Sequence, residues 1–137
     1  MSSANTYASG TTITAGTLKV ANATALGTGS VVVQSGGVLD LNGTTMTGTN
    51  ALTLNGTGIS SSGALINSST NAGTYAGLVS LGSASSIVGG TGAIALTHTG
   101  TITGATYGLT LGGAQGGSIV SAIGITSGTL TKQDAGT

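Results

Sequence analysis

The sequence predicts an all-β protein wound as a β-solenoid of about six short coils. Three observations predict this fold. Apolar residues, alone or in pairs, recur about every seven residues along the chain. Within each run they alternate with polar or small residues at a period of two, as in a half-buried strand. Gly, Asn or Ser closes most runs, and helical spacing of apolar residues persists nowhere.

The stretch 11–43 contains the first strands expected, with the sequences TTIT, GTLKV, SVVVQ and GVLDL. Later runs keep the alternation in three-residue units with apolar outer positions. These units are Leu39-Asp40-Leu41, Leu52-Thr53-Leu54, Ile94-Ala95-Leu96 and Leu109-Thr110-Leu111. Three sides of about seven residues predict a coil of about 21 to 23 residues, and we expect residues 1–137 to form a single unit.

The composition separates this fold from two alternatives. The chain has 27 Gly, no Pro, Phe or Trp, and 3% charged residues. A disordered linker would be poorer in β-branched residues, and the mean hydropathy here is +0.43. A sandwich would be expected to carry core aromatic residues. Asn42-Gly43 and Asn55-Gly56 could form hairpin turns, but a polar loop follows each. A narrow aliphatic core favours the solenoid.

Stacked coils also account for the scarcity of charge. Each side chain in a solenoid lies about 4.8 Å from its counterpart in the next coil. A charge repeated at one position would therefore face its own kind, which destabilises a sheet. Ser, Thr and Asn can instead form hydrogen-bonded ladders.

Charge and hydropathy exclude several functional classes. The net charge is zero, so a nucleic acid would meet no basic patch. No apolar run approaches the roughly 20 residues of a membrane helix, and MSSANTY lacks the features of a signal peptide. The chain has no Cys, which is compatible with an extracellular protein that relies on hydrogen-bonded strands.

Residues 5–43, NTYASGTTITAGTLKVANATALGTGSVVVQSGGVLDLNG, resemble the autotransporter-associated β-strand repeat of bacterial surface proteins. The matching pattern is NTYxGGTTIxAGTLxV, then ALGxG, then GxLDLNG, and Ser9 departs from it. The resemblance implies a right-handed parallel β-helix in a secreted or surface-attached stalk. Residues 50–131 look like the continuation of a tandem array.

The two ends indicate self-association. The final segment GTLTKQDAGT is similar to the part of the repeat that precedes a new copy, and no charged, Pro-rich or helical cap is visible. We therefore expect copies to associate head to tail into oligomers or filaments. The candidate contact residues are Thr12, Ile13, Thr17, Leu18, Lys19, Leu130 and Lys132.

We expect no enzyme, cofactor or metal site. Ser residues, His98 and either Asp40 or Asp134 could be assembled into a catalytic triad, but no nucleophile elbow occurs. The two Asp residues, almost a hundred positions apart, do not suggest an acid–base pair. Instead, we expect Asp40 to point outward, Asp134 to lie in a turn, and His98 to be exposed in a strand or bend. The glycine pairs lack the repeating Asp of calcium-binding solenoids.

Two alternative surface functions remain open. A flat face with T-x-T motifs could bind ice, and the motifs start at Thr12, Thr97 and Thr101, although they do not recur at one fixed coil position. Adhesion to a carbohydrate or host surface is the other, although few aromatic residues are available for stacking on sugars. N-x-[ST] sequons at Asn22, Asn42, Asn55 and Asn67 are expected by chance in so Thr-rich a chain.

Overall fold

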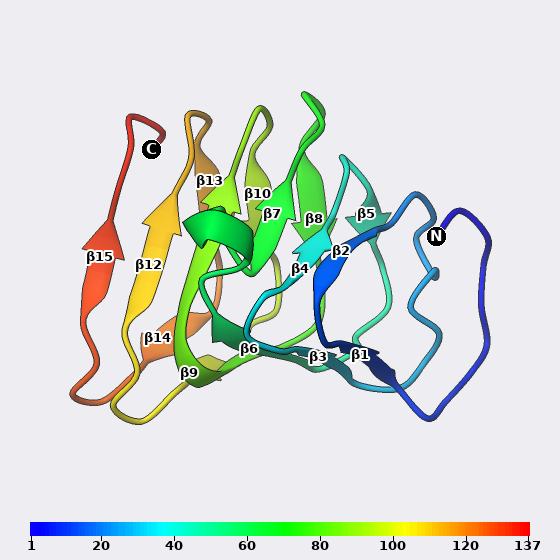
Figure 1. The fold of residues 1–137 in the computed structure, drawn as a ribbon, viewed down its shortest axis with the longest axis horizontal. Coiled ribbons are helices and arrows are strands. Elements are labelled where there is room, and N and C mark those ends of the chain that lie inside the picture. Colours follow the sequence, from blue (N-terminus) through cyan, green and yellow to red (C-terminus); the bar gives the residue numbers. More distant parts are fainter.

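Parallel strands wind the chain into a β-solenoid of about six turns with three sides. The structure is a computed structural model that describes residues 1–137. Figure 1 shows the axis lying horizontally, with the first strands at one end and β15 at the other. This confirms the predicted fold class. Every strand pair is parallel, because each strand pairs with strands one turn away along the axis.

The short strands fall on the three sides in a repeating order. The first side contains β1 (Thr11–Ile13), β3 (Val31–Val33), β6 (Leu52–Gly56), the beginning of β9 (Val79–Gly89), β11 (Thr101–Thr103) and β14 (Ala122–Gly124). The second contains β2 (Gly16–Lys19), β4 (Gly37–Asp40), β7 (Leu65–Asn67), the end of β9, β12 (Leu109–Gly112) and β15 (Leu130–Lys132). The third contains β5 (Thr45–Met46), β8 (Gly73–Tyr75), β10 (Ile94–Leu96) and β13 (Gly117–Ile119).

The strand register stacks apolar side chains into columns inside the solenoid. We call the first-side column that starts at Thr11 the β1 column; it continues through Val31, Leu52, Val79, Ile102 and Ile123. The β2 column on the second side consists of Leu18, Leu39, Leu65, Ile87, Leu111 and Lys132. Each column is therefore apolar except for one end member, Thr11 or Lys132.

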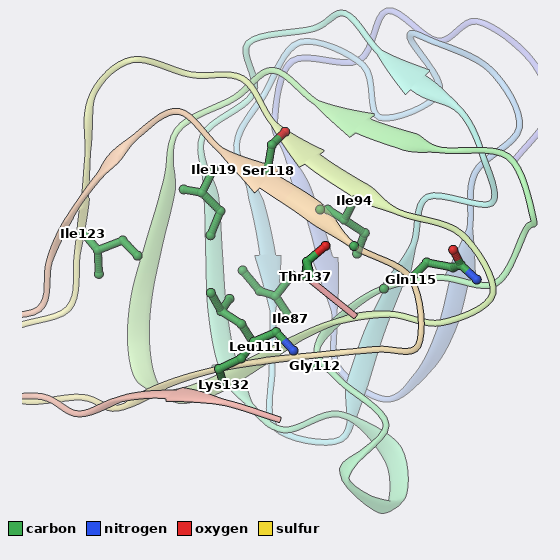
Figure 2. Close-up of a pocket in the computed structure, with 13 residues that line it drawn as sticks. Ile87, Ile94, Leu111, Gly112, Gln115, Ser118, Ile119, Ile123, Lys132 and Thr137 are labelled. Carbon is green, nitrogen blue, oxygen red and sulfur yellow. The ribbon is translucent and has the colours of Figure 1, made fainter. Parts of the chain in front are cut away.

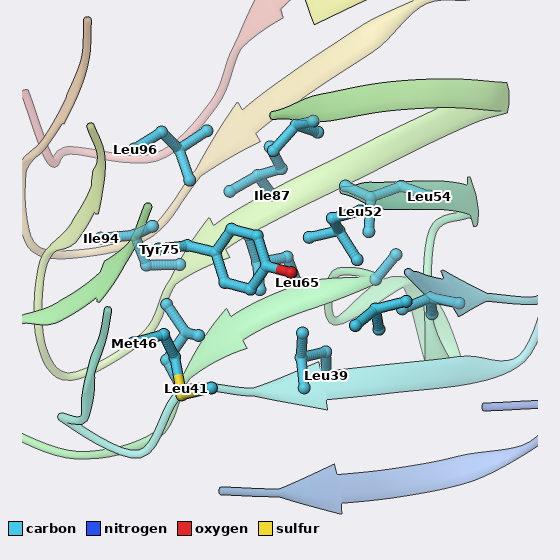
Figure 3. Packing of buried hydrophobic residues seen from close by; sticks show 14 of the residues in the cluster. Leu39, Leu41, Met46, Leu52, Leu54, Leu65, Tyr75, Ile87, Ile94 and Leu96 are labelled. Carbon is cyan, nitrogen blue, oxygen red and sulfur yellow. The ribbon is translucent and has the colours of Figure 1, made fainter. Parts of the chain in front are cut away.

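The core is aliphatic, as the absence of Phe and Trp predicts. A single cluster of 22 buried hydrophobic residues runs along the axis, and Tyr75 is its one aromatic member. Figure 3 shows Tyr75 among Leu and Ile side chains from neighbouring turns. Its hydroxyl donates a hydrogen bond of 2.9 Å to the backbone oxygen of Asn50. Burial raises the pKa of the Tyr75 phenol well above its usual range.

Buried amide side chains close the corners between sides. Asn67 is fully buried, and its side-chain nitrogen donates to the backbone oxygens of Asn71 and Ala93, both at 2.8 Å. Asn50 donates in the same way to Gly27 and Gly29. No buried side-chain nitrogen or oxygen lacks a partner, so the corners can be buried without the desolvation penalty of an unpaired polar group.

The third turn departs from the predicted coil length. From Thr11 to Val31 and from Val31 to Leu52 the chain advances 20 and 21 residues, close to the prediction, but from Leu52 to Val79 it advances 27. The extra residues include a 3₁₀ turn, η1 (Ile59–Ser61), that projects from the second side (Figure 1). The next turn differs as well, because a single strand of 11 residues, β9, continues around the corner and so belongs to both the first and the second side.

Asp40 lies on the outer face of the sheet as predicted, in register with Lys19, but it is not exposed to solvent. Its side chain is only 3% exposed. The carboxylate accepts hydrogen bonds from the backbone nitrogens of Asn42 (2.9 Å) and Ser68 (3.0 Å), and from Ser68 Oγ (2.6 Å). The loop that follows β7 covers a position that alternation within the strand assigns to the outside. Asp40 thus joins two turns at a corner.

Candidate functional site

The N-terminal end of the solenoid is an open hollow of about 430 Å³. Strands β1 and β2 form its floor, and each is hydrogen-bonded to another strand along only one edge. The Tyr7 hydroxyl lies 2.7 Å from Thr11 Oγ1. Thr11 thus has a partner for its hydroxyl although it occupies an inward column. The lining residues are Met1, Tyr7, Gly10, Thr11, Thr12, Ile13, Thr14, Ala15, Thr17 and Leu18.

Residues 1–10 supply the third side of this first turn. The backbone nitrogen of Asn5 donates to Thr24, and the backbone nitrogen of Thr28 donates to the oxygen of Tyr7. The segment is therefore attached to the turn that follows it, while its opposite edge is unpaired. Tyr7 and Met1, 37% and 42% exposed, lie in the same turn.

The C-terminal end opens into a hollow of about 280 Å³ that reaches into the core. Figure 2 shows the side chains of Ile87, Leu111, Ile119 and Lys132 around this space. Its outer rim has large exposed apolar side chains: Val120 is 58% exposed, Leu130 54% and Ile123 36%. Strands β13, β14 and β15 each pair along one edge only, so the end presents both apolar surface and free backbone groups.

After β15 the described residues continue the third side only as far as Thr137. Residues 133–137 follow β15 and stack on the preceding turn, with Gln133 N bonded to Leu111 O and Gly117 N to Thr137 O. No chain covers the outer edge of β13 beyond that point, where Ser118 and Val120 are exposed. The uncovered segment is on the same side that residues 1–10 occupy at the other end of the molecule.

The structure places all the predicted contact residues at the two ends. Thr12, Ile13, Thr17, Leu18 and Lys19 lie on β1 and β2, and Leu130 and Lys132 lie on β15. Sequence reasoning missed Tyr7, Thr11, Val120 and Ile123, which share these ends. These residues occupy the same positions in the first and last turns as inward or rim residues in the turns between. An alignment of the turns against one another could therefore have identified them.

Lys19 and Lys132 are not equivalent, although a Gly-Thr-Leu segment precedes each of them, at 16–18 and 128–130. Lys19 pairs in register with Asp40, whereas Lys132 pairs with Leu111. This difference of one residue places them on opposite faces of the sheet. Lys19 lies on the outer face, and its Nζ is 3.9 Å from Asp40 Oδ2. Lys132 ends an inward column, and its Nζ turns to the backbone oxygens of Gln133 and Asp134.

The few chemically reactive groups are not brought together. His98 is half-buried in a corner, where its Nδ1 accepts a hydrogen bond of 2.9 Å from Gly100 N. The only ion pair is the one between Lys19 and Asp40, so neither Asp lies beside His98. Asp134 lies in a bend with φ 62°, and its Oδ2 accepts from Gly113 N. No group of three potential metal ligands occurs. Asn67, the first residue of one of the sequons, is buried, and its side chain is already hydrogen-bonded within the protein.

The Thr residues do not form a regular flat array. Thr12, Val32, Thr53, Ser80, Thr103 and Gly124 follow one another along the outer face of the first side. Thr97 and Thr99 follow β10 and lie outside any strand. A third hollow of about 490 Å³ lies at a polar corner lined by Thr, Asn, Gly and Ala residues, none of them charged.

Neither the reactive groups nor the Thr residues form a site along the sides of the solenoid. The exposed strand edges at the two ends are therefore the candidate site.

The comparisons with known proteins add no relative. No protein-family model, curated protein or solved structure matches the chain. The structure contains no helix with the length and apolar character needed to cross a membrane.

Proposed function

We propose that the chain is a structural, non-enzymatic module that extends a bacterial surface protein or builds a fibre by stacking with further copies of itself. The observation that carries this proposal is the pair of open ends. Strands β1 and β2 at one end and β14 and β15 at the other each have a free edge; β1 and β14 belong to one parallel side, and β2 and β15 to another. A parallel sheet can continue across such a junction without reversal.

Two further features support a mechanical role. Backbone hydrogen bonds between turns, each worth about 1 kcal/mol net, repeat along the rod, and the aliphatic core runs through it. The resemblance of residues 5–43 to autotransporter repeats favours a location at the cell surface. In this role the sides of the rod set its length and stiffness, and the ends make the functional contacts.

Sedimentation velocity over a concentration series tests the proposal, with negative-stain electron microscopy of the same samples. We expect the sedimentation coefficient to rise with concentration and rods longer than one chain to be visible. A chain that stays monomeric at its highest soluble concentration would overturn the proposal.

A further inference from the structure

We propose that a second copy docks in one register, with its β1 on β14 and its β2 on β15 of the first copy. The inference rests on the proposed function and specifies the contact. The occupant is a second copy because its N-terminal end offers the same strand direction, the same three sides and a segment, residues 4–10, that continues the third side from the position of Thr137.

The columns on the first side continue across this junction. Thr11 of the second copy lies over Ile123, and Ile13 lies over Ile125, because these residues hold the same inward positions in their turns. Ile123 is 36% exposed in the single chain and becomes covered. The Thr11 hydroxyl already has Tyr7 Oη as a partner, so its burial leaves no unpaired polar group.

The second side fits in the same register. Gly16 of the second copy lies over Leu130, which is 54% exposed. A Cβ built on Gly16 would meet nothing within 4 Å, so space is available there for the Leu130 side chain. Leu18 lies over Lys132, whose ammonium already reaches the backbone oxygens of Gln133 and Asp134 at the rim. Its aliphatic stem can therefore lie under Leu18 while the charge stays in water.

On the third side, residues 1–3 of the second copy hold the same positions as residues 134–137 of the first, so the copies dock with residues 1–3 displaced. Residues 133–137 cover only the beginning of that side, and Val120 beyond them is 58% exposed. Residues 4–10 of the second copy supply the rest, since the segment 1–10 forms the third side of its own first turn. A shift outward by one turn would leave this gap open, and a shift inward would place two strands in the same space.

Disulfide trapping tests the register, because the chain has no Cys of its own. In the proposed contact Thr17 of one copy is the outward neighbour of Thr131 of the other. Directly opposed residues are about 4.8 Å apart, which a disulfide can span, whereas a residue one turn further is about 9.6 Å away. Thr110 is that residue, in the same outward column as Thr131.

The experiment mixes two single variants, Thr17→Cys and Thr131→Cys, under mild oxidation. We expect about tenfold more disulfide-linked dimer than from Thr17→Cys mixed with Thr110→Cys, because only the first pair lies within bridging distance. Each variant alone should give little dimer. Equal trapping of both pairs, or a dimer of Thr17→Cys alone, would overturn the register.

Sedimentation of the same mixtures separates the two proposals. Association without selective trapping would overturn the register and leave end-to-end stacking in place. Absence of association would overturn both, and selective trapping together with association supports both.

Discussion

Asp40 is the residue whose substitution separates a buried hydrogen-bond network from a surface ion pair. Replacing it with Ala leaves the backbone nitrogens of Asn42 and Ser68 without their acceptor at a covered corner. An unpaired buried donor costs about 1–3 kcal/mol, so we expect Asp40→Ala to lower the free energy of unfolding by about 2 kcal/mol or more. Urea denaturation followed by circular dichroism measures the change.

Lys19→Ala provides the control, because it removes the ion pair from the other side. The Lys19 side chain is 56% exposed and its Nζ is 3.9 Å from the carboxylate. A pair of this kind contributes about 0–1 kcal/mol. If Lys19→Ala destabilises the protein as much as Asp40→Ala, the ion pair and not the network explains the burial of Asp40.

The raised pKa of the buried Tyr75 phenol determines how the stability of the fold changes at alkaline pH. Burial raises the phenol pKa in the folded state above the unfolded value of 10.0, so the folded chain holds a proton that the unfolded chain releases. The stability that this pKa difference of Tyr75 contributes is therefore complete below pH 10 and declines as the pH rises above it. We expect the free energy of unfolding to fall above pH 10, and to fall less steeply in Tyr75→Phe. Parallel pH profiles for the two proteins would contradict this assignment.

At the scale of a structural element, replacing Gly113 tests how closely two turns must pack at the corner between the second and third sides. Its φ is 121°, and a Cβ at this position would lie 1.6 Å from the backbone oxygen of Gly89 in the preceding turn. Gly113→Ala must therefore push two stacked turns apart as well as adopt a strained backbone. We expect it to lower the midpoint of thermal unfolding strongly, or to unfold the turns from β12 onward, as hydrogen exchange would show.

Gly16→Ala is the matched control for this element. Gly16 also has a positive φ, 75°, but a Cβ there meets nothing within 4 Å. Only backbone strain remains, which costs about 1–2 kcal/mol. Equal effects of the two substitutions would show that conformation, and not the close approach of the turns, requires Gly113.

The sequence predicts most elements because apolar alternation marks the strands wherever one face is buried. Runs such as Leu52-Thr53-Leu54 and Ile94-Ala95-Leu96 lie within β6 and β10. It does not predict η1 or the long β9, since both consist largely of Gly, Ser and Ala, which strands and bends share. The end residues can be located from the sequence, but the inward position of Lys132 depends on a register that only the stacked turns define.

The whole molecule behaves as a one-dimensional stack in which each turn contacts only its neighbours. Stability in such a stack grows with every interface that is formed, so the terminal turns are the least supported. At the C-terminal end this applies to β13, β14 and β15, whose residues are mostly exposed or half-buried. A second copy at this end would therefore stabilise the last turns as well as lengthen the rod.

We expect Lys132 to weaken the proposed end-to-end contact. It occupies the end of a column whose other members are Leu and Ile, and an inward charge at a strand edge opposes association. Lys132→Leu would continue the column and bury apolar surface under Leu18 of a second copy. We expect the end-to-end dissociation constant to fall about tenfold or more, as measured by sedimentation over a dilution series.

Lys19→Leu is the control for charge and hydropathy, since it makes the same chemical change on the same side of the solenoid. The sequence predicts Lys19 as a contact residue, but its side chain lies on the outer face of β2, 56% exposed, and does not line either hollow. We expect it to leave the dissociation constant within about twofold, because exposed substitutions change interaction energies by only about 0.5 kcal/mol. Equal strengthening by both variants would mean that removal of positive charge anywhere drives association. Lys132 would then have no special position in the contact.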